Sequence, residues 1–81
     1  MEIDASKLKI GWNEIGKVGV DTGRITIHDP CYNKEQQKRL GFVIPTGFGD
    51  GLYPVDVRVK NYGTKEKPDK RIIAVFVYME R

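Results

Sequence analysis

Apolar residues recur at every second position from Tyr53 to Val59, and this two-residue period is the strongest constraint on the fold. Successive side chains of an extended strand point to opposite faces of a sheet. One face of this strand is therefore predicted to be buried, and the other, which carries the charged side chains, to meet solvent. Pro54 has no N–H to donate to a neighbouring strand, so it fits the entry of a strand or an edge strand.

Two shorter alternating segments, residues 17–21 and 24–28, flank the turn-forming residues Asp21-Thr22-Gly23. Gly23 can adopt the positive φ that a tight turn requires, so the pattern predicts a hairpin. Residues 42–44 predict a further short strand, which Pro45 stops.

The segment from Arg71 to Met79 is apolar on both faces. This pattern is typical of a central strand or of a strand that faces a partner chain. Because a chain of 81 residues cannot easily cover both faces, we predict a homodimer through this segment. Turn-forming residues between Asn61 and Lys70 indicate a long hairpin loop before it, and residues 8–12 predict an additional edge strand.

One short helix is predicted from Lys34 to Leu40. Asn33 supplies an N-cap oxygen, and Gly41 follows the last helix-forming residue. The segment has almost no apolar face, so it is expected at the surface. The elements together predict a mainly β fold, either a small open barrel or a two-sheet sandwich of five to six mostly antiparallel strands with one short surface helix.

The length of the chain predicts a single β-rich domain over residues 1–81. Apolar residues make up 40% and charged residues 31%, which is the composition of a globular protein and not of a disordered chain. A chain of this size buries only about 60% of its unfolded surface, so the core is expected to be small.

The cysteine and histidine counts exclude several kinds of site. One cysteine forms no internal disulfide, and one cysteine with one histidine is too few for a zinc site. No motif indicates a cofactor or a metal. The longest apolar run is too short to cross a bilayer and no secretory signal is found, so we expect a cytoplasmic protein without a membrane partner.

The net charge of +3 is concentrated between residues 60 and 71. A basic patch attracts phosphate groups, although a lysine-rich turn is more often simply a solvated loop. The predicted basic patch consists of Lys65, Lys67, Lys70 and Arg71.

A first set of candidate site residues, Asp29, Cys31 and Tyr32, directly follows a predicted strand. The simplest interpretation is structural, because Pro30 fixes a bend and the Asp29 carboxylate can accept hydrogen bonds from the following amides. A second interpretation makes Cys31 a nucleophile activated by His28, although these positions of an extended strand point to opposite sides. A third is ligand binding.

A second set of candidates lies in a glycine-rich segment and consists of Gly49, Asp50, Gly51 and Tyr53. The glycines suit a tight turn in which Asp50 accepts hydrogen bonds from backbone amides. Alternatively, they expose consecutive amides as a binding site for an anion. If the two segments face one pocket, Asp29, Tyr32, Asp50 and Tyr53 would contact a ligand together.

Three motifs of the chain resemble those of a set of small bacterial and phage proteins of unknown function. They are Val-Gly-Val-Asp-Thr-Gly at residues 18–23, Asp-Pro-Cys-Tyr at residues 29–32 and Gly-Asp-Gly-Leu-Tyr-Pro-Val at residues 49–55. The resemblance covers about residues 16–79 and implies no reaction. In a phage protein it would imply interference with a host process, with a nucleotide as a candidate ligand.

We expect no enzymatic activity, since no convincing acid–base pair or nucleophile system is found. The leading hypothesis is a non-catalytic module that binds a small anionic or nucleotide-like ligand, or a protein partner, through the two loops. The alternative is binding of single-stranded nucleic acid by aromatic stacking on a basic β surface, which is less expected because no RNA-binding motif is present. The aromatic candidates are Trp12, Tyr32, Phe48, Tyr53, Tyr62 and Tyr78.

Overall fold

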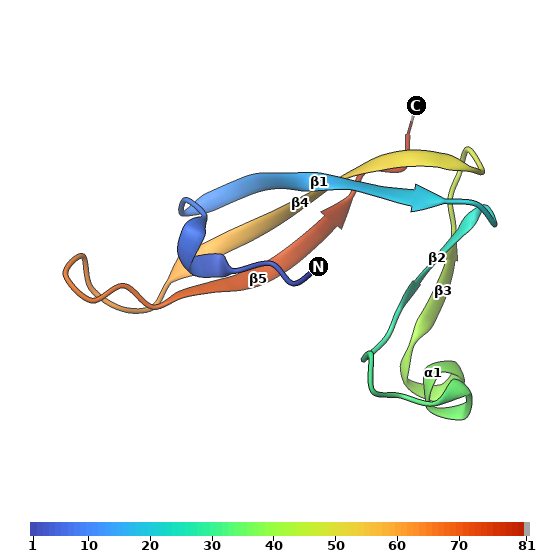
Figure 1. Ribbon diagram of the computed structural model, residues 1–81, viewed down its shortest axis with the longest axis horizontal. Helices are drawn as coiled ribbons and strands as arrows, with labels where there is room; N and C mark the ends of the chain where they lie inside the picture. Colours follow the sequence, from blue (N-terminus) through green and yellow to red (C-terminus); the bar gives the residue numbers. More distant parts are fainter. Residues whose placement is uncertain (81) are drawn as a thin grey trace. The chain divides into compact units, whose positions relative to one another are not determined.

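The computed structural model describes residues 1–80, which form two compact units. The first unit comprises Met1–Val18 and Tyr53–Tyr78, and the second is centred on Gly19–Leu52. A three-stranded sheet belongs mainly to the first unit, and a two-stranded sheet belongs to the second (Figure 1).

The three-stranded sheet has the strand order β1-β4-β5. Its strands are β1 (Gly11–Val20), β4 (Gly51–Asn61) and β5 (Lys70–Val77). β4 and β5 pair antiparallel through a hairpin loop, as the sequence predicts. The predicted alternation in β4 is also confirmed, because Tyr53, Val57 and Val59 are buried whereas Arg58 and Lys60 are exposed.

The amino-terminal segment lies against the face of this sheet that carries the buried β4 residues. It contains the short 3-10 helix η1 (Ala5–Lys7), which contacts β5 (Figure 1). The Lys70 ammonium donates a hydrogen bond of 2.8 Å to the Leu8 carbonyl. Ile3 shares a recess with Val55 of β4. These contacts cover part of this face of the sheet, on which Val75 opposite Val57 stays 66% exposed, and they leave the other face uncovered by this segment.

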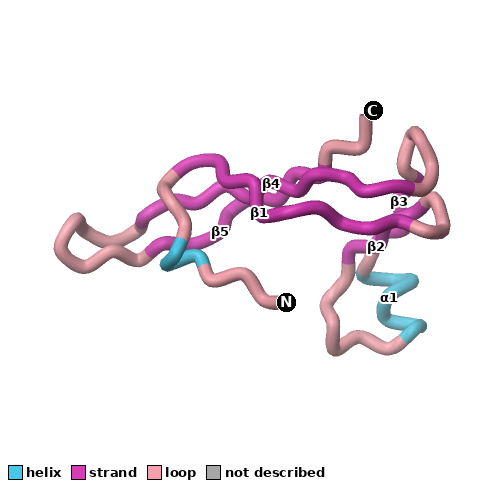
Figure 2. Tube along the Cα trace, turned by 45° about the horizontal axis from the view of Figure 1, so that its top comes forward, coloured by secondary structure: helices cyan, strands magenta, loops and turns pink. Residues whose placement is uncertain are grey.

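The two-stranded sheet pairs two short antiparallel strands, β2 (Arg24–Ile27) and β3 (Phe42–Pro45). The helix α1 (Lys34–Leu40) lies between them in the chain and has the predicted bounds (Figure 2). Its start is fixed by a capping box, in which the side chains of Asn33 and Gln36 each accept a hydrogen bond from the other's backbone amide. At Gly41 a Cβ would lie 2.7 Å from the Ile27 carbonyl oxygen, so the helix ends where only glycine fits.

The predicted hairpin between residues 17–21 and 24–28 is wrong. Residues 17–20 belong to β1 of the first sheet, and β2 pairs with β3 instead. The reason lies at the intervening turn, because the backbone amide and the hydroxyl of Thr46 donate to the Gly23 carbonyl at 2.9 and 3.3 Å. These bonds join the start of β2 to the end of β3. The predicted edge strand at residues 8–12 is also revised, since β1 begins at Gly11 and continues without a break to Val20.

β5 is an edge strand, and β4 takes the central position. The apolar pattern of β5 predicts a central strand or a strand that faces a partner chain, and at this edge Ile73, Val75 and Phe76 are 43%, 66% and 50% exposed. Pro54 consequently lies in the central strand, where its carbonyl accepts a hydrogen bond of 3.0 Å from the Tyr78 amide. The homodimer through β5 stays a prediction.

Within residues 1–80, five strands in two sheets and one short α-helix confirm the predicted mainly β class. None of the seven residues of α1 is buried, in agreement with the predicted surface position. Neither helix of this part of the chain has the length and apolar character needed to cross a membrane.

Candidate functional site

The uncovered face of the three-stranded sheet, here called the open face, carries most of the exposed rings of the first unit. Directly paired residues of neighbouring strands share a face, and the register pairs Asp56 with Phe76, Arg58 with Ala74 and Lys60 with Arg71. Ring contacts add residues from β1 and from the two ends of the β4–β5 hairpin. The open face comprises Trp12, Asp56, Arg58, Lys60, Tyr62, Arg71, Ala74, Phe76 and Tyr78.

Three aromatic rings of the open face form one continuous cluster. The centroids of Trp12 and Phe76 are 6.4 Å apart with the rings edge-to-face at 79°. The centroids of Phe76 and Tyr78 are 6.2 Å apart, and these two rings are nearly parallel. The three residues are 49%, 50% and 47% exposed, in the order Trp12, Phe76 and Tyr78. The rings fix one another's orientation and still present about half of their surface to solvent.

A carboxylate lies beside this aromatic cluster. Asp56 lines a shallow recess of about 280 Å³ together with Trp12 and Phe76. Its position follows from the register, because Asp56 lies directly opposite Phe76 in the β4–β5 pair. The recess therefore combines two apolar ring surfaces with one hydrogen-bond acceptor.

At the other end of the open face, two cations lie over one aromatic ring. The Lys60 ammonium is 5.1 Å and the Arg71 guanidinium 5.6 Å from the centroid of the Tyr62 ring. Both distances fall within the range of cation–π attraction. Tyr62 is 56% exposed, so the contacts leave part of its ring accessible.

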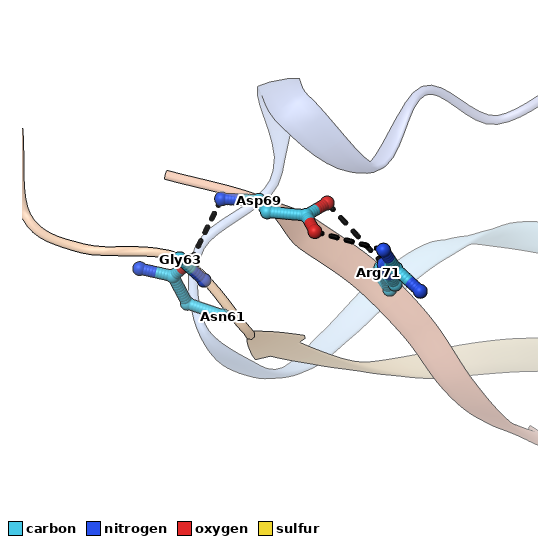
Figure 3. Close-up of polar contacts among 4 residues, drawn as sticks. All are labelled: Asn61, Gly63, Asp69 and Arg71. Carbon is cyan, nitrogen blue, oxygen red and sulfur yellow. Dashed lines mark hydrogen bonds and ion pairs between the residues drawn. The ribbon is translucent and has the colours of Figure 1, made fainter. Parts of the chain in front are cut away.

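The hairpin loop that carries Tyr62 is held by hydrogen bonds (Figure 3). The Asn61 side-chain oxygen accepts from the backbone amides of Gly63 and Asp69 at 2.9 and 2.8 Å. The Asp69 carboxylate in turn pairs with the Arg71 guanidinium at 2.9 Å, which raises the pKa of that guanidinium. The loop therefore holds Arg71 and Tyr62 in fixed positions at the end of the sheet.

The predicted basic patch is divided between two environments. Lys65 and Lys67 lie exposed in the hairpin loop. Lys70 is bound to the Leu8 carbonyl, and Arg71 is paired with Asp69. The exposed cations of this patch are therefore Lys65, Lys67 and Arg71, whereas the Lys70 ammonium is directed to the amino-terminal segment.

The residues Asp29, Cys31 and Tyr32 form a local turn in the second unit. The Asp29 carboxylate accepts a hydrogen bond of 2.9 Å from the Cys31 amide, and the Asp29 carbonyl accepts one of 3.0 Å from the Tyr32 amide. The Tyr32 carbonyl accepts a hydrogen bond from the Gln37 side chain of α1. This arrangement matches the structural interpretation, in which Asp29 stabilises the bend that leads into the helix.

The Cys31 thiol has a raised pKa, mainly because it donates a hydrogen bond to the Asp29 carboxylate and lies close to that negative charge. Hydrogen bonds from the Cys31 backbone amide and then from its thiol lower the pKa of Asp29. A nucleophilic cysteine needs the opposite shift, since the thiolate is the reactive form. The geometry therefore argues against the interpretation of Cys31 as an activated nucleophile.

We expect alkylation of Cys31 by iodoacetamide to be slow near pH 7 and to accelerate about tenfold per pH unit until the raised pKa is reached. Asp29→Asn removes the charge that raises this pKa, so its rate profile should move to lower pH, whereas Asp50→Asn should leave the profile unchanged. Mass spectrometry of the modified chain measures the rates. Fast alkylation of the unaltered protein below the normal range of a free thiol would contradict the assignment.

The residues Gly49, Asp50 and Gly51 form the connection into β4. Gly49 and Gly51 have φ of 75° and 154°, which explains the need for glycine at both positions. The connection lies beside Gly23, where an added Cβ would be 3.7 Å from the Gly49 Cα and 3.9 Å from an Asp50 carboxylate oxygen. Tyr53, the last residue of this predicted set, is 1% exposed in β4.

The two predicted loops lie at opposite ends of the β2–β3 ladder (Figure 1). The loop with Asp29 and Tyr32 follows Ile27 at the end of β2, whereas Asp50 lies beside Gly23, which precedes β2. The intervening strand is about 10 Å long. The structure therefore does not bring Asp29 and Tyr32 together with Asp50.

Comparison with known proteins returns no matching family model, curated protein or solved structure. Among residues 1–80, no group of three or more histidine, cysteine, aspartate or glutamate side chains is arranged to hold a metal ion. The open face is therefore the arrangement in the described chain from which we argue function.

Sequence analysis named Trp12, Tyr62 and Tyr78 as possible stacking residues but did not identify Phe76 or Asp56 as site residues. The two-residue period does place Phe76 and Tyr78 on one face. The position of Trp12 beside Phe76, and of Asp56 in one recess with both rings, depends on the strand order and register, which one sequence does not determine.

Proposed function

We propose that the protein is a non-catalytic module that binds single-stranded nucleic acid on the open face. The observation that carries the proposal is the cluster of Trp12, Phe76 and Tyr78, whose rings are each about half exposed on a sheet surface. Unpaired bases stack on such rings irrespective of sequence, and each stacked base contributes about 1–3 kcal/mol.

The charge distribution supports a polyanionic ligand. Residues 53–78 hold six basic and three acidic side chains, so this segment carries the whole net charge of +3. The segment includes the two cations over Tyr62 and the exposed loop lysines Lys65 and Lys67. Phosphate groups of a strand whose bases stack on the rings would meet these cations at the hairpin end of the sheet.

The same arrangement favours single strands over duplexes. Bases within a duplex are already stacked on one another and do not present their faces to an aromatic side chain. A protein surface that relied on phosphate contacts alone would not make this distinction. The exposed rings therefore predict selectivity for unpaired nucleotides, and the cations predict sensitivity to salt.

The proposal is tested by fluorescence anisotropy with a labelled oligothymidylate of about ten nucleotides and the matching duplex. We expect saturable binding to the single strand, weaker binding to the duplex, and affinity that falls with salt concentration. Changing both Lys65 and Lys67 to Gln should reduce the slope of log Kd against log salt by about 1.4, which is about 0.7 for each lost phosphate contact. The same change at Lys34 and Lys38 of α1 serves as the matched control and should leave the slope unaltered.

Absence of saturable binding, or equal affinity for single strand and duplex, would contradict the proposal. The open face would then be better explained by the protein partner of the leading hypothesis from the sequence. The two explanations are distinguishable, because a ring cluster that binds a protein partner is not expected to bind single-stranded and duplex oligonucleotides with different affinities.

A further inference from the structure

We infer that Asp56 makes the open face select guanine among the bases that stack on it. The inference rests on the proposed function and adds a specificity that stacking alone does not provide, because every base has an aromatic face. It is carried by the recess that the Asp56 carboxylate lines together with the rings of Trp12 and Phe76.

The Asp56 carboxylate is placed as an acceptor without an internal donor. It is partly exposed in the middle of β4, and within residues 1–80 no hydrogen bond or ion pair engages it. Asp69, in the hairpin loop before β5, differs in this respect because its carboxylate is paired with Arg71. A carboxylate on a surface that attracts phosphate weakens binding unless it contacts another part of the ligand.

Guanine offers the matching group of donors. An ionised carboxylate has two acceptor oxygens and no donor. The Watson–Crick edge of guanine presents two adjacent N–H donors, the ring N1–H and the exocyclic N2–H, which can bind both oxygens at once. Cytosine and adenine each present an amino group beside a ring-nitrogen acceptor, and thymine presents one N–H between two carbonyl acceptors. These three bases would each place at least one acceptor against the carboxylate.

The geometry of the recess allows stacking and edge recognition of the same base. The rings of Trp12 and Phe76 line the recess together with Asp56, so a base that stacks on either ring lies beside the Asp56 side chain at the surface of the sheet. Asp56 lies in that surface, directly opposite Phe76. Its carboxylate is therefore in the position to accept hydrogen bonds from the edge of a base stacked in the recess.

The test compares three labelled oligothymidylates that differ at one central position, which is thymine, guanine or hypoxanthine. Hypoxanthine is guanine without the exocyclic amino group, so it removes one donor and keeps the stacking surface. For the unaltered protein we expect about tenfold tighter binding of the guanine probe than of the thymine probe, and loss of most of this gain with hypoxanthine.

The protein variants locate the preference at one side chain. Asp56→Asn replaces one acceptor oxygen by a donor and removes a negative charge, so the ratio of the Kd for the thymine probe to the Kd for the guanine probe should fall from about ten to about one. Glu66→Gln, which makes the same charge change in the exposed hairpin loop, should retain the guanine preference. Circular dichroism establishes that each variant is folded.

Each outcome bears on the inference separately from the proposed function. If the unaltered protein binds all three probes equally, the inference fails while the proposed function stands. A guanine preference in the Asp56→Asn variant as large as that of the unaltered protein would likewise overturn the role of Asp56. If no probe binds, the proposed function fails, and the inference fails with it. The hypoxanthine comparison uses the unaltered protein and does not depend on the folding of any variant.

Discussion

Replacing Trp12 and Phe76 together with alanine is expected to weaken binding of single-stranded oligonucleotide by about a hundredfold or more. Each ring that stacks on a base contributes about 1–3 kcal/mol, which corresponds to about 5- to 150-fold in Kd. The two rings also support each other through their edge-to-face contact. Anisotropy titrations at one fixed salt concentration measure the effect, and the single variants should lie between the double variant and the unaltered protein.

Phe48→Ala is the matched control for these ring deletions. Phe48 is 53% exposed, similar to Trp12 and Phe76, but it belongs to the second unit. Its loss should leave oligonucleotide affinity unchanged. If all ring deletions weaken binding equally, or if the double variant keeps its affinity while remaining folded, the open face is not the binding surface.

Gly63→Ala is expected to lower the free energy of unfolding by about 2–3 kcal/mol. A Cβ at Gly63 would overlap the Lys67 carbonyl oxygen, lie 2.7 Å from the Asp69 nitrogen and lie 3.1 Å from the Pro68 carbonyl carbon. All three atoms are backbone, so the hairpin loop must shift to relieve the overlap. Because small domains are only marginally stable, a loss of this size should be plain in urea unfolding.

Gly47→Ala provides the comparison for this substitution. Nothing lies within 4 Å of a Cβ at Gly47, and its φ is not in the left-handed region. The change should therefore alter the free energy of unfolding by no more than about 0.5 kcal/mol. Equal effects of the two substitutions would show that the close packing around Gly63 does not limit stability.

Local features were predictable from the sequence because their causes lie within a few residues. Asn33 and Gln36 sit three positions apart, which is the spacing of a capping box, and α1 begins where this spacing predicts. The alternation in β4 likewise predicted which of its side chains are buried. Both patterns depend on backbone geometry within one element.

Pairing between strands was not predictable in the same way. The turn ending at Gly23 suits a hairpin, but the Gly23 carbonyl is bound by Thr46, more than twenty residues later. The register shift between Arg58 and Val59 of β4 leaves Ile73 of β5 without a directly opposite residue. As a result, Arg71 of β5 lies on the open face. A strict two-residue period would place Arg71 with Ile73 and Val75.

The candidate site was also not predictable from the sequence. The loop residues selected from the sequence are rich in glycine, proline and aspartate, and the structure explains Asp29, Gly49 and Gly51 through turns and positive φ. Such residues are needed for chain reversal whether or not a ligand binds. The open face combines side chains from three strands, so its composition becomes visible only when the strand order β1-β4-β5 is known.

The location of Trp12 has a practical consequence. It is the only tryptophan in the chain, and its indole lies half exposed against Phe76 on the open face. Fluorescence excited at the long-wavelength edge of the protein's ultraviolet absorption therefore comes from Trp12 on the open face. Quenching of this fluorescence, or a shift of its emission maximum, reports ligand binding to the open face directly and without an attached dye.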